Sequence, residues 1–323
     1  MVKNILITGG AGYIGSHISE ILIKKKKKIF ILDNLSTGHK RLINKKAKFI
    51  LGDITNTNTI KKIFKKNKID SVIHLAAALS VGESQKKPNK YKWINIEGTK
   101  RLLSSIKNSN VKNIIFSSTC AVFKDVFDKV SERSKLKPTS VYGKTKLIGE
   151  NLIKKFSKDN KINYGILRFF NVAGASSTGK IGQINKGDQL FKNLSMEVYK
   201  KKPIFKIYGT KYKTRDGTCI RDYIHVTDIS EIHYTVLSKI NKYNISTVLN
   251  CGYGKGISVY EAIQEFKKHA SKHSKIVKFP NRKGDMVKII ASNKKLMQFI
   301  KWRPKFNSLR KIVKSCLIWE KRQ

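Results

Sequence analysis

Residues 8–17 read TGGAGYIGSH and decide the fold of this chain. They follow an apolar strand-like run, Asn4 to Thr8, and lead into a segment from Ile14 to Ile23 whose apolar residues recur at helical spacing. Glycines at such a junction let the backbone turn tightly and come close to a pyrophosphate, while the N–H groups at the start of the helix face the phosphates. The stretch therefore predicts a strand–loop–helix unit that binds a dinucleotide.

The glycines of this loop and two later acids indicate which dinucleotide is bound. Gly9, Gly12 and Gly15 have the spacing GxxGxxG rather than the commoner GxGxxG. Asp33 ends the second apolar strand, 18 residues after Gly15, where an acid accepts the hydroxyls of the adenine ribose. This favours NAD over NADP. Asp53 ends the next strand, where it could meet the adenine or simply cap the strand.

Apolar strands alternate with amphipathic segments through the first half of the chain. Runs rich in Ile, Val and Phe, separated by helices, are typical of a parallel sheet that is covered on both faces. The second half is less regular and richer in turns. We predict an α/β fold, with a Rossmann-like, doubly wound parallel sheet over residues 1–172. A smaller C-terminal substrate-binding domain is expected over residues 173–323, with some of its segments returning to the sheet. The expected strands are residues 4–8, 29–33, 47–53, 71–77, 113–119 and 163–170.

A tyrosine and a lysine four residues apart indicate proton chemistry. In VYGKTK, Tyr142 and Lys146 would share one helix face. The lysine charge, together with the positive charge of a nicotinamide, would favour the phenolate and lower the pKa of Tyr142. Tyr142 could then remove a proton from a sugar hydroxyl. Ser117 to Thr119 end the fifth strand, at the sheet edge where ligands bind, so Thr119 could hydrogen-bond the reacting oxygen.

With these motifs in place, the sequence resembles the extended short-chain dehydrogenase/reductase family and, within it, the UDP-glucose 4-epimerases. The likeness covers nearly the whole chain and rests on TGGAGYIGSH, DNLSTGH, GDI, HLAA, VGES, SST, YGKTK, RFFNVAGA, DGTCIRDYIHVTD, NCGYGKGISVYE and RKGD. It implies NAD as cofactor and UDP-glucose and UDP-galactose as substrates, interconverted by reversible oxidation at carbon 4 in galactose metabolism. It also implies a homodimer, formed through the helix after Asn95 and the helix that bears Tyr142.

The resemblance assigns roles by position. It makes Thr119, Tyr142 and Lys146 the catalytic residues. The residues that it places around NAD are Gly9, Gly12, Tyr13, Ile14, Gly15, Asp33, Asn34, Asp53, Ile54, Leu75, Ala76, Ala77, Asn95, Ser117, Tyr142, Lys146 and Phe169. The residues that it places around the UDP-sugar are Thr119, Tyr142, Asn171, Gln189, Leu190, Tyr208, Arg221, Tyr223, Arg282, Asp285 and Ile289.

Several of these substrate residues also fit by their chemistry. Arg221 and Arg282 carry forked donors that match a diphosphate better than lysine does. Asp285 could accept from ribose hydroxyls, and Asn171 could bond a diphosphate oxygen. The residues alone equally allow a surface ion pair between Arg282 and Asp285, and a simple turn at Asn171. Ile289 lies where the resemblance places the sugar's 2-substituent, so we expect slower turnover of N-acetylated substrates.

The chain departs from the pattern at two of these positions. Phe169 stands where the family has a tyrosine, and Gln189 where it has Asn or His. A dehydratase or decarboxylase of the same fold is disfavoured because such enzymes need an acid after Thr119, where Cys120 and Ala121 stand.

The net charge of the chain suggests a different class of function. Lys and Arg number 68 against 21 Asp and Glu, which gives a net charge of +47. A domain this basic suggests nucleic-acid binding. Only ten of the basic residues are Arg, however, and the lysines spread along the whole chain. We interpret them as solvated faces and expect no specific nucleic-acid partner. A nucleic-acid-binding protein on a Rossmann shell would not need the Tyr–Lys pair that is intact here.

The apolar runs and the cysteines indicate where in the cell the protein is expected. Lysines interrupt the apolar runs well short of the roughly 20 residues that a membrane span needs, so no membrane partner is expected. No secretory signal is evident after Met1. The cysteines show neither metal nor disulfide spacing, so we expect no metal and a reducing cytoplasm.

Overall fold

The structure is a computed structural model, and it describes residues 2–124, 129–185, 187, 189–281 and 286–323. The chain divides into two units that interleave along the sequence. The first comprises Met1–Val122, Leu136–Phe169 and Ser230–Leu249, and the second comprises Phe123–Lys135, Phe170–Ile229 and Asn250–Gln323. This division into units does not test the predicted domain limits, residues 1–172 and 173–323, which remain a prediction.

The first unit is built on a seven-stranded sheet with the order β12-β7-β5-β4-β1-β2-β3. From β7 to β3, every neighbouring pair is parallel. This confirms the predicted doubly wound parallel sheet. Its strands are β1 (Asn4–Thr8), β2 (Lys28–Asp33), β3 (Lys48–Leu51), β4 (Ser71–His74), β5 (Asn113–Thr119), β7 (Asn163–Phe169) and β12 (Thr247–Cys251).

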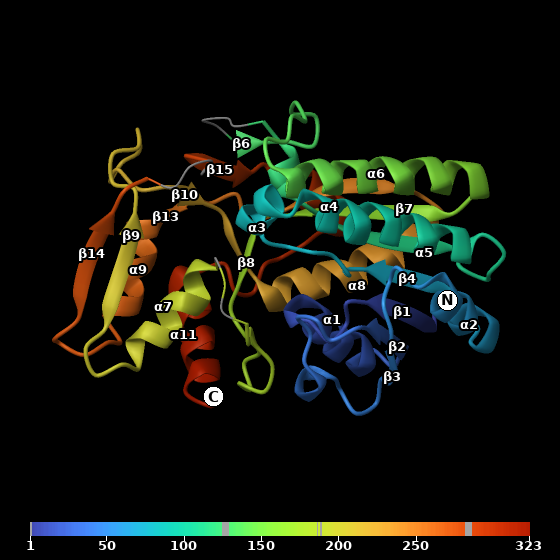
Figure 1. The fold of residues 1–323 in the computed structure, drawn as a ribbon, viewed down its shortest axis with the longest axis horizontal. Helices are drawn as coiled ribbons and strands as arrows, with labels where there is room; N and C mark the ends of the chain where they lie inside the picture. The colour runs from blue at the N-terminus through green and yellow to red at the C-terminus, as the bar shows by residue number, and fades with distance from the viewer. Residues whose placement is uncertain (1, 125–128, 186, 188, 282–285) are drawn as a thin grey trace. The chain divides into compact units, whose positions relative to one another are not determined.

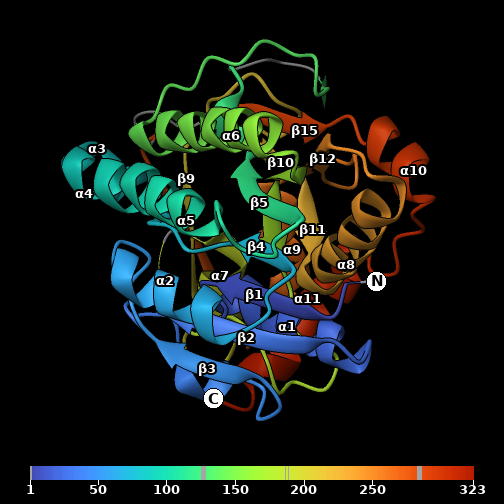
Figure 2. The same ribbon diagram turned by 90° about the vertical axis from the view of Figure 1, so that its right-hand side faces the viewer.

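Helices cover both faces of this sheet (Figure 2). The helical elements are α1 (Tyr13–Lys24), η1 (Lys40–Leu42), α2 (Thr57–Lys66), α3 (Val81–Lys86), α4 (Pro88–Tyr91), the π-helical η2 (Lys92–Glu97), α5 (Gly98–Ile106), η3 (Cys120–Val122), α6 (Val141–Asn160) and α8 (Val226–Tyr243). A core that includes Val72 and Ile114 packs against α2, α5 and α6. On the other face Gly165 lets α8 approach, because a Cβ there would lie 3.0 Å from Val236 Cγ1.

Three strands end earlier than expected, namely β3, β4 and, by one residue, β7. β3 ends at Leu51, and Asp53 instead accepts the N–H of Thr55 at 2.7 Å, which closes a tight turn. β4 ends at His74 rather than at Ala77. The three residues after His74 form a loop at the carboxyl edge of the sheet. That edge is where a ligand would bind.

The second unit holds small sheets with helices beside them (Figure 1). A four-stranded sheet has the order β13-β10-β15-β6, and two further pairs are β11-β8 and β14-β9. The strands are β6 (Lys129–Val130), β8 (Asn171–Ala173), β9 (Ile204–Tyr208), β10 (Ile220–Arg221), β11 (Tyr223–His225), β13 (Ile257–Ser258), β14 (Lys275–Phe279) and β15 (Lys288–Ala291). The helices are α7 (Leu190–Val198), α9 (Val259–Lys267), α10 (Lys294–Ile300) and α11 (Leu309–Glu320).

A buried carboxylate ties the strands of the second unit together. Asp222, between β10 and β11, accepts backbone N–H bonds from Tyr253 at 2.9 Å, Gly254 at 2.8 Å and Ala291 at 3.2 Å. Burial raises the pKa of Asp222 to about 6, against the opposing effect of these bonds. The arrangement fixes the end of β10, where Arg221 lies.

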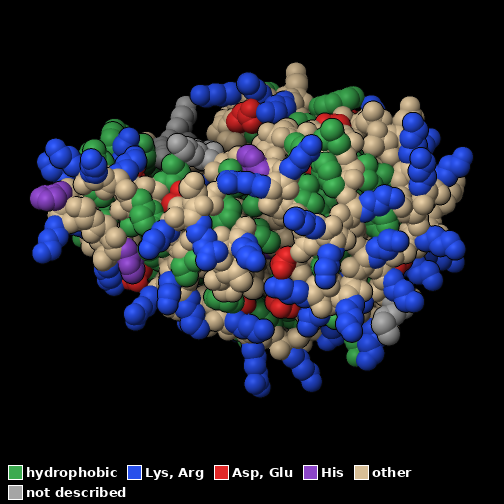
Figure 3. All heavy atoms as spheres, turned by 90° about the horizontal axis from the view of Figure 1, so that it is seen from below, with side chains coloured by type: hydrophobic (Ala, Val, Ile, Leu, Met, Phe, Trp, Pro, Cys, Tyr) green, Lys and Arg blue, Asp and Glu red, His purple; other side chains and the backbone are tan. Residues whose placement is uncertain are grey.

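The surface is dominated by lysine. Figure 3 shows Lys and Arg side chains scattered over the visible face, with few acidic groups between them. Among the helices that the structure describes, none combines the length and apolar character that crossing a membrane would require.

Candidate active site

The glycine loop between β1 and α1 has the geometry of a phosphate cradle. Gly9 has φ +73°, and a Cβ there would lie 2.7 Å from the backbone nitrogen of Ala76. A Cβ on Gly15 would lie 2.4 Å from the Gly9 carbonyl oxygen, so only glycine fits. Gly12 is the N-cap of α1 and gives no side-chain cap, while Tyr13 and Ile14 form the first turn. The first N–H groups of α1 and its positive dipole end are therefore available to an anion.

Asp33 ends β2 beside this loop. Its carboxylate accepts the N–H of Ala11 at 3.0 Å and of Leu35 at 2.8 Å. Burial raises the pKa of Asp33 above its usual value, although both bonds oppose the shift. The carboxylate is thus held in place on the loop side of the sheet, as expected of a ribose acceptor.

The next predicted contacts form a small polar group. Asn34 donates to Asp53 Oδ2 at 2.6 Å. Partial burial would raise the pKa of Asp53, but bonds from Thr55 and Asn34 outweigh it and the net shift is downward. Asp53, Thr55 and Arg101 line a polar pocket of the first unit. Ile54, by contrast, is buried in the hydrophobic core.

Tyr142 and Lys146 lie near the start of α6, one turn apart. Ser140 caps this helix by accepting the N–H of Gly143. Thr119, at the end of β5, lies close enough to Tyr142 for its hydroxyl to lower the pKa of the phenol in part. Lys146 is 4% exposed, and its Nζ lies 4.8 Å from the centre of the Phe116 ring. Thus the structure brings together the predicted catalytic residues.

The protein's own groups shift the pKa of Tyr142 upward, whereas the expected lowering included the positive charge of a nicotinamide. Burial raises its pKa to about 12, and the Thr119 hydroxyl offsets only part of this effect. Burial also lowers the pKa of Lys146 to about 8, while the charge of Glu150 acts in the opposite direction. The chain's own residues therefore do not produce the lowered tyrosine pKa. Desolvation of the phenol outweighs the opposing effect of Thr119.

The remaining predicted cofactor residues differ in whether their polar groups are already hydrogen-bonded within the protein. Ser117 is buried at the end of β5, and its Oγ has no hydrogen-bond partner among the described residues. Asn95 is 3% exposed, and its amide is used within the protein. Leu75, Ala76 and Ala77 are half-buried in the loop after β4. Phe169 ends β7 and packs against His233, with ring centroids 5.4 Å apart.

The predicted UDP-sugar residues beyond Thr119 and Tyr142 belong to the second unit. In that unit Arg221 Nη1 donates to the carbonyls of Ile220 at 3.1 Å and Val287 at 3.4 Å. Among the described residues, its other guanidinium nitrogens have no hydrogen-bond partner. Asn171 is exposed on β8, and Ile289 on β15 is 1% exposed and pairs in register with Arg221.

The other predicted substrate residues have varied surroundings. Gln189 is exposed at the N-cap of α7, and Leu190 begins that helix. Tyr208 ends β9 and stacks on Phe279 with 5.0 Å between centroids. Arg282 and Asp285 lie outside the described residues.

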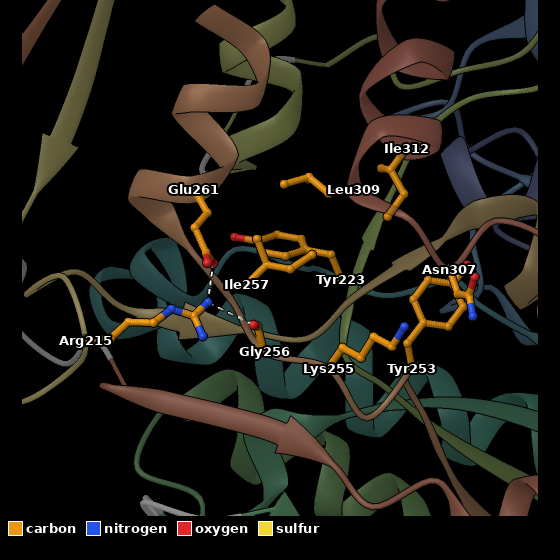
Figure 4. A pocket seen from close by; sticks show the side chains of 10 residues that line it. All are labelled: Arg215, Tyr223, Tyr253, Lys255, Gly256, Ile257, Glu261, Asn307, Leu309 and Ile312. Carbon is orange, nitrogen blue, oxygen red and sulfur yellow. Dashed lines mark hydrogen bonds and ion pairs between the residues drawn. The ribbon is translucent and has the colours of Figure 1, made fainter.

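Tyr223 lines a pocket within the second unit (Figure 4). Tyr253, Leu309 and Ile312 supply further apolar walls, and Lys255 points along the pocket. Apart from Tyr223, none of the residues that line this pocket was predicted to bind substrate. The role of Tyr223 toward a UDP-sugar stays a prediction.

Comparison with known proteins places the chain in a family. Residues 5–252 match the NAD dependent epimerase/dehydratase family. The chain belongs to this family. It is 37% identical to a UDP-glucose 4-epimerase of Lactobacillus helveticus over 320 residues, which cover 98% of this chain and 97% of that protein. These matches confirm the resemblance that the motifs indicate.

Solved structures extend the likeness. A crystal structure of a UDP-glucose 4-epimerase superposes with a TM-score of 0.95 at 34% identity, covering 99% of this chain and 98% of the other. The UDP-glucose 4-epimerase of Bifidobacterium longum, solved in complex with NAD+ and UDP, gives a TM-score of 0.90 at 31% identity, covering 99% and 98%.

NAD, the cofactor of the epimerase/dehydratase family, fits the residues present. The glycine cradle leaves no space for a Cβ at Gly15, and Asp33 is held beside it. Ser117 Oγ is buried without a hydrogen-bond partner among the described residues, which is costly unless a ligand completes it. In the described part of the chain no group of three or more His, Cys, Asp or Glu side chains could hold a metal ion.

Sequence reasoning missed a second set of residues beneath the site. Glu150, two turns after Tyr142 on α6, is fully buried and accepts from Arg168 at 2.9 and 2.7 Å and from Ser118 at 2.6 Å. The signal available was the spacing Tyr142–Lys146–Glu150, which places a third charged group on the same helix face. His74 also escaped notice, although it lies within the quoted HLAA motif.

Proposed function

We propose that the chain is an NAD-dependent 4-epimerase of UDP-hexoses that interconverts UDP-glucose and UDP-galactose through a 4-keto sugar. One observation carries this function within a family already known to use NAD. Tyr142 lies beside Thr119 at the carboxyl edge of the sheet, with the buried Lys146 one helical turn away. This arrangement suits removal of a proton from a hydroxyl at a carbon that loses hydride.

Each residue of the site has its own role in the proposed reaction. Bound NAD+ would supply the hydride acceptor for carbon 4 of the sugar. Tyr142 accepts the proton of the 4-hydroxyl and gives it back, while Thr119 holds the reacting oxygen. Lys146 brings a positive charge that favours the phenolate, and Ser117 offers a free hydroxyl to the cofactor.

Binding of the nucleotide part is assigned to the second unit. The forked donors of Arg221 and the exposed amide of Asn171 suit a diphosphate. If UDP is bound firmly and the hexose makes few contacts, the 4-keto sugar can rotate between oxidation and reduction and present its other face. Binding energy from the remote UDP group then serves the reaction at carbon 4. Elimination, as in a dehydratase, lacks its acid because Cys120 and Ala121 follow Thr119.

We also propose that the protein is a cytoplasmic homodimer active in galactose metabolism. Its four cysteines are all free, which suits a reducing compartment. Ile148 is a large apolar side chain, 41% exposed, on α6, one of the two helices through which the resemblance implies dimerisation. Trp93, 49% exposed, lies on η2, just before the other helix, α5. Light scattering of the purified protein should give twice the mass of 36.8 kDa. A monomer across micromolar concentrations would contradict the dimer.

The deciding experiment compares the protein with a Tyr142→Phe variant. The purified chain should interconvert UDP-glucose and UDP-galactose and carry NAD. The variant keeps the ring and loses the titrating oxygen, so we expect turnover to fall by roughly 10²–10⁴-fold while NAD stays bound. Circular dichroism and the bound NAD content serve as controls for the fold. Near-wild-type turnover in the variant would refute the assignment of the base.

A further inference from the structure

His74 lies at the end of β4, 2% exposed, with both ring nitrogens in hydrogen bonds to threonines from other elements. Nδ1 lies 2.7 Å from Thr8 Oγ1 at the end of β1, and Nε2 lies 3.0 Å from Thr99 Oγ1 on α5. The imidazole therefore joins the strand that leads into the glycine loop to a helix behind the sheet.

The neighbouring bonds fix the tautomer of this ring. Thr99 Oγ1 donates its single proton to the carbonyl of Asn95 at 2.6 Å, so it can only accept from His74, and Nε2 must carry a proton. Burial and the charge of Lys146 lower the pKa of His74 to about 3, so the ring is neutral and Nδ1 is an acceptor. Thr8 then donates to Nδ1 and accepts the N–H of Ala76 at 3.3 Å.

The network continues from Asn95 to the helix that bears Tyr142. Asn95 Oδ1 accepts the N–H of Ala78 at 2.8 Å, and Nδ2 donates to the Ala78 carbonyl at 3.2 Å and to Thr145 Oγ1 at 3.0 Å. Thr145 Oγ1 in turn donates to the carbonyl of Tyr142 at 2.8 Å. The loop after β4 is thus held at Ala76 through Thr8 and at Ala78 through Asn95.

We propose that His74 is a positioning residue, whose single neutral tautomer sets the NAD-facing loop Leu75–Ala78 in register with the helix that carries Tyr142. Its Nδ1 end controls the loop at Ala76, which also lies against Gly9. Its Nε2 end controls the Thr99–Asn95 segment and, through Thr145, the backbone of Tyr142. The inference rests on the proposed function, because it treats the loop as a cofactor contact and Tyr142 as the base.

Three substitutions separate the two ends of the ring. His74→Phe keeps the aromatic volume beside Phe116, whose centroid is 5.6 Å away, and removes both bonds. His74→Asn can keep an acceptor near the Nδ1 position, and His74→Gln can keep a donor near the Nε2 position. The assay measures kcat, KM for UDP-glucose and the dissociation constant of NAD for each variant. His225→Phe in the second unit is the matched control, because His225 is also fully buried and bonds a hydroxyl, that of Ser315.

We expect the Asn and Gln variants to differ in opposite directions in their losses of kcat and NAD affinity. His74→Phe should lower kcat and weaken NAD binding by about tenfold each, since a lost buried hydrogen bond costs about 1–2 kcal/mol, with KM for UDP-glucose within about twofold. The Asn variant should retain NAD affinity better than kcat, and the Gln variant should retain kcat better than NAD affinity. His225→Phe should lower thermal stability without changing NAD affinity. In the wild-type protein, ¹⁵N NMR should show His74 as the neutral tautomer protonated at Nε2.

Several outcomes would overturn the proposal. Wild-type behaviour of His74→Phe, or equal losses of kcat and NAD affinity in both the Asn and Gln variants, would leave the ring a merely structural group. A proton on Nδ1 would also refute it, and this measurement needs no variant to fold. If the wild-type protein bound NAD but did not epimerise UDP-glucose, the proposed function would fail, while the NMR and NAD-binding results would still test the role of His74.

Discussion

The ionisation of Tyr142 should depend on the oxidation state of the bound cofactor. Within the chain, burial raises the pKa of Tyr142 to about 12 from an ordinary value of 10. This shift corresponds to about 3 kcal/mol against the phenolate. At pH 8 only about one molecule in 10⁴ would then carry the anion, so the chain alone makes a poor base.

A positive charge near the phenol reverses this balance. One unit charge at about 5 Å, in a medium of effective dielectric constant 20, stabilises an anion by about 3 kcal/mol, which lowers its pKa by about 2–3 units. The oxidised nicotinamide carries such a charge and the reduced ring does not. We therefore expect Tyr142 to titrate about 2–3 pH units lower in the NAD+ form of the protein than in the NADH form.

Phenolate absorbance measures this difference directly. The oxidised and reduced holoproteins are titrated side by side, and the spectra of Tyr142→Phe in each form are subtracted to remove the other tyrosines. A titration near pH 9–10 should appear in the NAD+ form and be absent below about pH 11 in the NADH form. Equal pKa values in the two forms would refute the argument that cofactor charge activates the base. In the Lys146→Met variant the pKa of Tyr142 should rise in both forms of the protein, because the lysine cation is lost.

Three further predictions concern stability, charge and specificity. Arg168→Met leaves the buried Glu150 carboxylate without its cation and should cost about 3–5 kcal/mol of stability, measured by thermal unfolding, whereas the double variant Arg168→Met/Glu150→Gln should regain much of it. Duplex DNA should bind weakly, without sequence preference, and dissociate near physiological salt in fluorescence anisotropy; tight, selective binding there would contradict the reading of the +47 charge as solvated surface. Ile289→Tyr should reduce kcat/KM for UDP-N-acetylglucosamine more than for UDP-glucose, and equal processing of the acetylated sugar by both proteins would show that Ile289 is not the gate.

Local sequence patterns predicted the cradle and the catalytic pair because each depends on neighbours in the chain. The glycine spacing in residues 8–17 requires a close turn, and the interval from Tyr142 to Lys146 is one helical turn. The pKa of Tyr142 could not be predicted in the same way, because it depends on how much water the fold removes from the phenol. Strand ends also escaped, since Asp53 and Ala77 continue strand-like runs in the sequence but lie beyond the last strand residues, Leu51 and His74.

The buried polar groups show why the network around His74 was invisible in the sequence. His74 bonds residues 66 positions before it and 25 after it, and Asn95 reaches 50 positions along to Thr145. In the sequence these are only polar residues at the ends of apolar runs. Once folded, both ring nitrogens of His74 and both N–H groups of the Asn95 amide are bonded within the protein, so they can fix geometry.

Ser117 is the opposite case, because its Oγ is buried and the described residues offer it no hydrogen bond. Ser19 and Ser157 are also without partners, but both lie inside helices, away from the edge where the parallel strands end. An unpaired buried hydroxyl costs free energy unless something completes it. Ser117 lies near the carboxyl edge of the sheet, in the strand that ends at Thr119, so we expect the bound cofactor to complete it.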